Sequence, residues 1–156
     1  MPGKIDQRLA ELKIELPNAA APMANYVPAV RTGNLLFVSG QICQWNGENR
    51  FRGKCGHEFG YEQGRLAARL CGLNLIAHLR HALYGDLDRV VRCVKLVGYV
   101  NSTPDFTDQP LVVNGCSDLM VEVFGDAGKH ARVSVGVSSL PGGAAVEIEG
   151  LFQVRQ

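Results

Sequence analysis

The sequence predicts an α+β fold, in which helices pack against a mixed β-sheet. Two long segments, 58–84 and 107–124, space their apolar residues as helices do. Shorter segments alternate polar and apolar residues, or run apolar, as strands do: 27–42, 90–100, 130–140 and 144–154. The resulting order, β-β-α-β-α-β-β after a leading helix, is typical of helices layered on one mixed sheet.

Length and composition narrow the class of protein. The chain has 156 residues, near the commonest size for one domain, and we expect residues 1–156 to form a single domain. Hydrophobic residues make up 46% and charged residues 20%, as in soluble globular proteins. Sixteen basic and 15 acidic residues leave a formal charge of +1 without a basic run, so no nucleic-acid partner is expected.

The sequence also argues against a membrane or a secretory destination. No apolar stretch approaches the roughly 20 residues that a bilayer requires, so we expect no membrane partner. Acidic residues interrupt the N-terminal stretch, unlike a signal or transit peptide: Asp6, Glu11 and Glu15. The expected location is therefore the cytoplasm.

Neither a disulfide framework nor a metal site is expected. The five cysteines contain no CxxC pair, and their number is odd. Cys43, Cys55 and His57 lack the spacing of a zinc site. His78 and His81 lie three apart on a predicted helix, but no second ligand pair accompanies them. We predict no cofactor.

The N-terminal half predicts a helix and a hairpin. Residues 4–14 have the spacing of a short amphipathic helix, and an ordered connection follows. A hairpin turns at Thr32–Asn34 into an apolar strand that starts with Leu35 to Val38. Residues 43–57 are rich in Gly, Asn and charge, and predict a loop.

Two long helices are predicted in the middle of the chain. The first runs from about Glu58 to Tyr84, and Gly85 ends it. Its expected apolar stripe is Leu66, Leu70, Leu73 and Ala77. The second runs to Phe124, with Thr107 as its N-cap and Pro110 in its first turn.

The strand at 90–100 predicts a partner for the sheet. It is apolar on both faces, and two helices can cover only one of them. No remaining segment is large enough to cover the other face, so we expect a second copy of the protein there. A bent sheet that covers its own residues is the alternative. On the second helix Asn114 points nearly opposite the expected core stripe, with Val121 beside it, which favours a subunit contact.

Arg132 heads a strand whose other polar-side positions are small residues. Val133, Val135 and Val137 share one face, and Arg132 and Ser134 share the other. A short loop within "LPGGA" would pair this strand with the last one and put Glu147 on the side of Arg132, about 13 Å away at roughly 3.3 Å per residue. A guanidinium suits a carboxylate ligand, because its fork donates two parallel hydrogen bonds. The alternative is a surface arginine at a strand end.

The chain resembles the YjgF/RidA family from about Asn25 to Val154. The resemblance rests on "NYVPAV", "LLFVSGQI", "DLDRVVRCVKLVGYVNSTPDF", Asn114 and above all "ARVSVGVSSLPGGAAVEIE". These motifs are specific jointly, though each is weak alone. Residues 1–24 lie outside the match and look like an N-terminal helical extension of a longer branch.

The resemblance implies a chorismate-mutase-like fold, with two helices on one face of the sheet and a homotrimer whose sites lie in clefts between subunits. The best-known members are enamine/imine deaminases, which hydrolyse 2-aminoacrylate and related 2-imino acids to 2-oxo acids and ammonia. By matching positions, Arg132 would bind the substrate carboxylate and Glu147 would position the attacking water. Tyr26, Ser39 and Asn114 would line the pocket. Ser134 would also contact substrate, where deaminases often have a cysteine.

Two other classes of function remain open at this point. One is a trimeric binding or regulatory protein that captures a small carboxylate without turnover. The other is a protective protein of the chaperone-like type suggested for relatives. The sequence therefore predicts a small-carboxylate site at Arg132, with imine hydrolysis as its chemistry.

Overall fold

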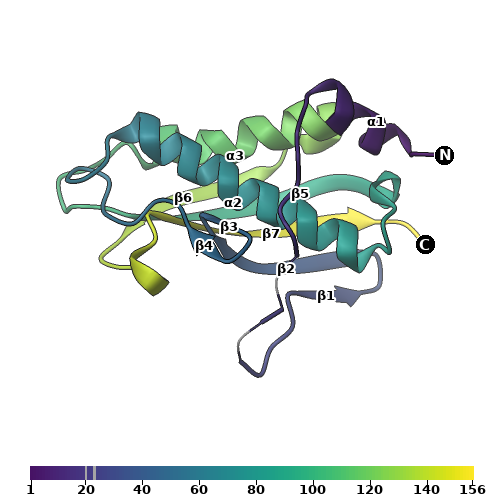
Figure 1. Ribbon diagram of the computed structural model, residues 1–156, viewed down its shortest axis with the longest axis horizontal. Helices are drawn as coiled ribbons and strands as arrows, with labels where there is room; N and C mark the ends of the chain where they lie inside the picture. Colours follow the sequence, from purple (N-terminus) through teal and green to yellow (C-terminus); the bar gives the residue numbers. More distant parts are fainter. Residues whose placement is uncertain (20, 23) are drawn as a thin grey trace.

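Two long helices lie side by side across one face of a five-stranded sheet (Figure 1). The computed structural model describes residues 1–19, 21–22 and 24–156. The helices are α2 (Tyr61–Ala82) and α3 (Gln109–Phe124). The strands of the sheet, in spatial order, are β1 (Ala29–Thr32), β2 (Leu35–Ile42), β7 (Val146–Val154), β5 (Val90–Asn101) and β6 (Ala131–Val137).

The sheet is mixed because α3 carries the chain from β5 to a parallel neighbour, β6, whereas the other pairings are antiparallel. The predicted α+β class and the order of the main elements are confirmed. The predicted pairing of the last two strands is wrong, because β5 lies between β6 and β7. The "LPGGA" segment forms a 3₁₀ turn at Pro141–Gly143 instead of a hairpin loop.

The predicted loop at 43–57 contains a small hairpin of its own. Strands β3 (Gln44–Trp45) and β4 (Glu48–Asn49) pair across Asn46 and Gly47. Both turn residues have positive φ, at 49° and 89°, which is the backbone that a two-residue hairpin turn requires and that Asn-Gly adopts readily.

The ends of the long helices differ from the prediction by a few residues. Helix α2 begins after Gly60, whose backbone N–H donates to the side chain of Gln63 at 3.0 Å. Helix α3 follows Asp108 rather than Thr107, without a side-chain cap, and Pro110 lies in its first turn as predicted. Such a proline loses no helical hydrogen bond, because the first N–H groups have no partner within the helix.

The apolar stripe predicted for α2 is partly confirmed: Ala77 is buried and Leu70 and Leu73 are partly buried, but Leu66 is not. Leu66 is 58% exposed, whereas Ala67, Ala68, Cys71 and Leu75 are fully buried. The reason is the closeness of the two helices: a Cβ on Gly115 of α3 would lie far inside contact distance of the carbonyl oxygen of Arg65. Large side chains at this crossing would hold the helices apart.

No helix among the described residues covers the second face of the sheet. Along β7, Val146, Ile148, Phe152 and Val154 are buried beneath the helices, while Glu147, Glu149, Leu151 and Gln153 on the other face are only half-buried. Val30, Phe37, Val133 and Val135 are each between 40% and 52% exposed. This open face, defined by those four side chains and the outward residues of β5 and β7, is the one for which the sequence predicted a second copy.

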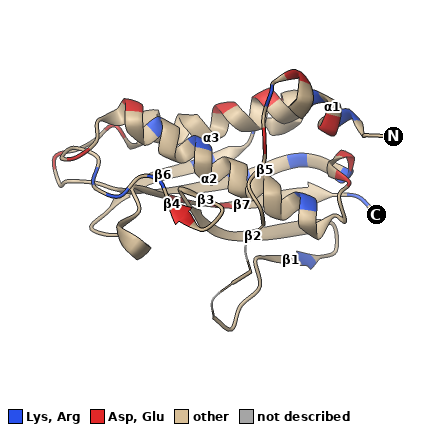
Figure 2. Cartoon of the chain, in the orientation of Figure 1, with Lys and Arg blue, Asp and Glu red and all other residues tan. Residues whose placement is uncertain are grey.

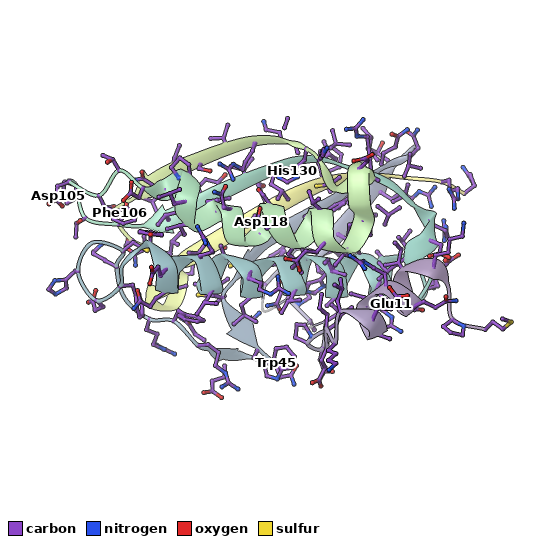
Figure 3. All side chains as sticks on the ribbon, turned by 90° about the horizontal axis from the view of Figure 1, so that it is seen from above. Glu11, Trp45, Asp105, Phe106, Asp118 and His130 are labelled. Carbon is purple, nitrogen blue, oxygen red and sulfur yellow. The ribbon has the colours of Figure 1, made fainter. Side chains whose placement is uncertain are left out.

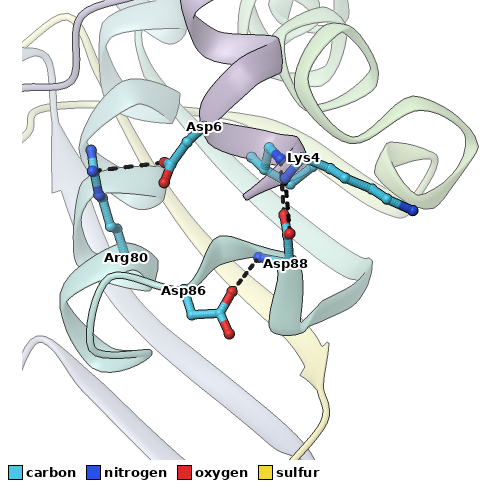
Figure 4. Close-up of polar contacts among 6 residues, drawn as sticks. Lys4, Asp6, Arg80, Asp86 and Asp88 are labelled. Carbon is cyan, nitrogen blue, oxygen red and sulfur yellow. Dashed lines mark hydrogen bonds and ion pairs between the residues drawn. The ribbon is translucent and has the colours of Figure 1, made fainter. Parts of the chain in front are cut away.

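Helix α1 (Lys4–Glu11) is tied to the turn before β5 (Figure 4). The carboxylate of Asp88 accepts the backbone N–H groups of Lys4 at 2.8 Å and Ile5 at 2.9 Å. These bonds, that of Ile5 first, lower the pKa of Asp88. Lys13 has a φ of 57° just past the helix, so the helix ends before the predicted residue 14. Across the part of the chain that the structure describes, no helix has the length and apolarity to span a bilayer.

Substitution of Gly115 by Ala should destabilise the protein. The new methyl group meets the backbone of α2, which cannot rotate away, so we expect the free energy of unfolding to fall by roughly 1–3 kcal/mol. For a chain of this size that corresponds to a melting temperature lower by roughly 2–12 °C in a thermal scan. Asp118→Ala, an exposed change on the same helix, is the control, and equal melting temperatures for the two variants would show that the helices have room to separate.

Candidate functional site

Arg132 projects from the edge strand β6 toward α3. Its Cα lies opposite Leu96 of β5, which is fully buried beneath the helices. The Arg132 guanidinium donates from Nη1 to Asn114 Oδ1 at 2.7 Å and to Ser117 Oγ at 3.2 Å. Both acceptors are on α3, so Asn114 does not point away from the fold as the sequence suggested: it reaches down the flank of the helix to the edge strand.

The charge of Arg132 has no counter-ion nearby. Within residues 1–19, 21–22 and 24–156, Arg8, Arg50, Arg69 and Arg80 form ion pairs, whereas no carboxylate lies within 4.0 Å of Arg132. Arg132 lines a shallow depression with Asn114, Ser117, Asp118, Val121, Lys129 and His130. An unpaired, half-buried guanidinium with neutral hydrogen-bond partners is suited to bind an anion.

His130 and Ser117 extend this network, and the sequence analysis missed both. Ser117 Oγ lies 2.8 Å from His130 Nε2, and His130 Nδ1 lies 2.6 Å from the carbonyl oxygen of Gly128. Figure 3 shows His130 beside α3, on the side away from α2. Spacing could have indicated them: His130 stands two residues before Arg132 on the strand, and Ser117 one helical turn after Asn114.

Ser134 lies on the same face as Arg132, but its hydroxyl is enclosed. The Oγ atom is buried and has no hydrogen-bond partner among the described residues. The backbone groups of Ser134, unlike its hydroxyl, face the free edge of β6. Val137 C=O accepts from Ser102 N–H on the β5 side, so alternate residues turn their backbone groups toward β5, and Arg132, Ser134 and Gly136 turn theirs to the free edge.

Glu147 lies on the open face of the sheet. It is flanked by Ile42 of β2 and Tyr99 of β5. Burial first, and then the charge of Glu149, raise the pKa of the Glu147 carboxyl. A Cβ on Gly40 would come within 3.1 Å of that carboxyl, so the absence of a side chain at Gly40 leaves room for it.

Tyr99, Glu149 and Ser39 accompany Glu147 on this face. The Tyr99 hydroxyl donates to Glu149 Oε1 at 2.7 Å, and this bond is the main reason why the pKa of Tyr99 is raised. Ser39 lies in a bulge of β2 and donates its hydroxyl to Val27 C=O at 2.8 Å. Tyr26, 56% exposed, precedes Val27, whose carbonyl oxygen accepts from Ser39.

The predicted site residues therefore divide into two half-sites. The arginine half-site contains Arg132, Asn114 and Ser134, and the glutamate half-site contains Glu147, Ser39 and Tyr26. The prediction that Glu147 shares a side of the sheet with Arg132 is wrong, because it assumed that β6 and β7 pair as a hairpin. Their Cα atoms are two strands and three residues apart, roughly 14 Å, and the side chains point to opposite faces.

The cysteines and histidines do not form a metal site. In the ranges that the structure describes, no three His, Cys, Asp or Glu side chains gather as metal ligands would. All five cysteines are free and buried. Burial raises the pKa of Cys55 to about 11, whereas a hydrogen bond from Cys71 lowers the pKa of Cys43 to about 6.

The sequence and the fold match a known family. The family described as YjgF/chorismate mutase-like, "putative endoribonuclease", matches residues 6–148. The chain belongs to this YjgF/RidA family and has its chorismate-mutase-like fold. Because the match begins at residue 6, it includes most of α1, and an N-terminal extension at residues 1–24 stays a prediction.

Individual relatives are similar over nearly the whole chain. Protein TCP17 of Trypanosoma cruzi is 46% identical over 154 residues, 98% of this chain and 96% of that protein. The crystal structure of protein Atu1372 from Agrobacterium tumefaciens superimposes with a TM-score of 0.91 at 43% identity, covering 97% of this chain and 92% of that one. A protein described as a "putative endoribonuclease" from Shewanella oneidensis gives a TM-score of 0.93 at 31% identity, covering 97% and 100%.

The raised pKa of Glu147 can be measured directly. We expect a titration of side-chain carboxyl ¹³C shifts to give a pKa above 4.5 for this residue. In Glu149→Gln the pKa should fall, because the neighbouring negative charge that disfavours ionisation is gone. Asp126→Asn, a change on the exposed turn before β6, should leave it unchanged. A Glu147 pKa that is the same in Glu149→Gln as in the wild type would contradict the coupling of the two carboxyls.

Proposed function

We propose that the protein is an enamine/imine deaminase, which hydrolyses 2-aminoacrylate-type 2-imino acids to 2-oxo acids and ammonia at sites between the subunits of a homotrimer. The observation that carries the proposal is the division of the site residues. One half-site offers an unpaired guanidinium for a carboxylate, and the other offers a carboxyl with a raised pKa for a water. Since they lie on opposite faces of one sheet, a site containing both needs two copies of the chain.

The open face of the sheet supports association. Val30 and Phe37 are cross-strand neighbours and about half exposed, and Phe37 lies opposite Leu151 of β7. Exposed apolar side chains grouped in this way mark surfaces that other protein covers. A copy placed there would bring its arginine half-site toward the glutamate half-site of its neighbour.

The chemistry needs only these groups and water. Arg132 would hold the carboxylate of the 2-imino acid and so orient its C=N carbon toward a water at Glu147. Glu147 would accept a proton from the water as its oxygen bonds to that carbon, which gives a carbinolamine. With the imine bound in its protonated iminium form, this proton would then pass from Glu147 to the carbinolamine nitrogen while the hydroxyl proton returns to Glu147. The C–N bond would break as the C=O bond forms, and ammonia and the 2-oxo acid would leave. A raised pKa suits Glu147 to this exchange, because it brings the carboxyl closer to neutral pH.

Charge and thiol chemistry agree with this proposal. Figure 2 shows Lys and Arg interspersed with Asp and Glu along the ribbon, and the sequence has no basic run, which favours a small ligand over nucleic acid. The five free, buried cysteines suit a reducing compartment, so we place the activity in the cytoplasm.

Loss of the Arg132 guanidinium should impair turnover. The substrate is 2-iminobutyrate generated by an amino-acid oxidase, and its spontaneous hydrolysis is subtracted. We expect Arg132→Ala to lower kcat/KM roughly 10- to 100-fold, the usual range for a lost charge-assisted hydrogen bond. Arg50→Ala, which removes an exposed guanidinium from the residue after β4, is the control. Unchanged ammonia release in Arg132→Ala would contradict the deaminase. If the wild type binds a carboxylate without turnover, the protein is a binding protein instead. If the wild type shows neither binding nor turnover, the chaperone-like alternative remains.

Mixed assemblies test whether the site lies between copies. Arg132→Ala and Glu147→Gln should each have strongly reduced activity alone, but each retains the half-site that the other lacks. Unfolding and refolding equal amounts together should restore roughly one site in four, because each site draws its two halves at random from two chains. Light scattering should give the mass of three chains. Activity that stays at the level of the separate variants would place both residues in one chain, contrary to the proposal.

A further inference from the structure

His130 is held in one tautomer by the backbone. Its Nδ1 lies 2.6 Å from the carbonyl oxygen of Gly128, and a carbonyl can only accept, so Nδ1 carries the hydrogen. Burial first, and also the charge of Arg132, lower the pKa of His130, so the ring is neutral near pH 7. The other nitrogen, Nε2, is therefore an acceptor.

This acceptor fixes the direction of the Ser117 hydroxyl. Ser117 Oγ is 2.8 Å from Nε2 and must donate its hydrogen there. A lone pair of the same oxygen is then available to accept Arg132 Nη1–H at 3.2 Å. The contacts form a directed chain, from Arg132 through Ser117 and His130 to the backbone at Gly128. The other charged groups that line this depression are Lys129 and Asp118.

The consequence for Arg132 is a choice between the two edges of its guanidinium. Nη1 has two hydrogens, and Asn114 Oδ1 and Ser117 Oγ take both. Among the described residues, nothing accepts from Nε or Nη2. A carboxylate that binds by two parallel hydrogen bonds must then use Nε–H and Nη2–H, since the end-on fork made by Nη1 and Nη2 is already occupied.

We propose that Ser117 and His130 are positioning residues for Arg132, which lock Nη1 and present the Nε–Nη2 edge of the guanidinium to the carboxylate of the ligand. The inference rests on the proposed function only in taking Arg132 as the carboxylate anchor. It requires no turnover. It also gives a role to two polar side chains that the hydrolysis itself does not use.

The tautomer is the first test. Long-range ¹H–¹⁵N correlation spectra of the histidine rings at pH 7.5 should show His130 neutral, with its hydrogen on Nδ1, and the loss of one signal set in His130→Gln assigns it among the four histidines. A hydrogen on Nε2 would turn the Ser117 hydroxyl away and overturn the proposal, whether or not the protein is a deaminase.

Binding of 2-oxobutyrate, measured by calorimetry without turnover, is the second test. Ser117→Ala and His130→Leu should each weaken binding roughly three- to tenfold, the usual range for one lost hydrogen bond. Ser117→Thr keeps the hydroxyl and His130→Gln keeps an acceptor, so both should bind within about twofold of the wild type. Thermal scans confirm that each variant is folded.

The outcomes separate this inference from the deaminase proposal. Equal weakening by the conservative and the truncating variants would mean a merely structural role, and no weakening by either would mean that Arg132 needs no positioning. The positioning role is also overturned if the wild-type protein does not bind 2-oxobutyrate, because Arg132 is then no carboxylate anchor. Binding that follows the expected pattern without imine turnover would overturn the deaminase alone.

Discussion

Side chains of a β-strand alternate between the two faces of its sheet, and in this protein that alternation separates Arg132 from Glu147. Arg132 lies opposite Leu96 of β5, and Glu147 lies opposite Tyr99 of the same strand, three residues farther along. An odd separation on a shared strand puts the two side chains on opposite faces. No rotamer can bring them together, since a sheet stands between them. Any function that uses both must therefore be a property of an assembly, and the exposed apolar side chains of the open face provide a surface on which an assembly can form.

Close packing above the sheet gives the arginine half-site its order. A Cβ on Gly98 would overlap the side chain of Val113, so a glycine there lets α3 lie close to the side of the sheet formed by β5 and β6. At that distance Asn114 and Ser117, on the flank of the helix, reach the guanidinium of an edge strand. The same closeness recurs between the helices at Gly115. Small residues at contacts between elements thus place the polar groups of the site, although they touch no ligand themselves.

Local patterns predicted the elements, but not the pairing that decides the site. Alternation at Val133, Val135 and Val137 located β6, and the Asn-Gly turn signal lay within a segment predicted only as a loop. The error came from reading the Leu140–Ala144 turn as a hairpin loop. Sequence spacing shows how near two strands are along the chain, but not whether they pair in the sheet. The parallel pairing of β5 with β6 depends on how α3 packs, which no local window contains. The family resemblance supplied the individual residues, and only the fold shows that they form two separate half-sites.

The hydroxyl and the backbone of Ser134 have different surroundings. Deaminases of the family often have a cysteine there, at a position that the resemblance assigns to the substrate pocket. In this chain Ser134 Oγ is buried and has no hydrogen-bond partner among the described residues. The N–H and C=O groups of Ser134 face that edge, and they are the same for serine and cysteine. A side chain that points inward can change packing, while the backbone keeps its hydrogen-bonding groups at the edge. Ser117 and His130 differ from Ser134 in this respect, because their side chains form a hydrogen-bonded chain that ends at the Arg132 guanidinium.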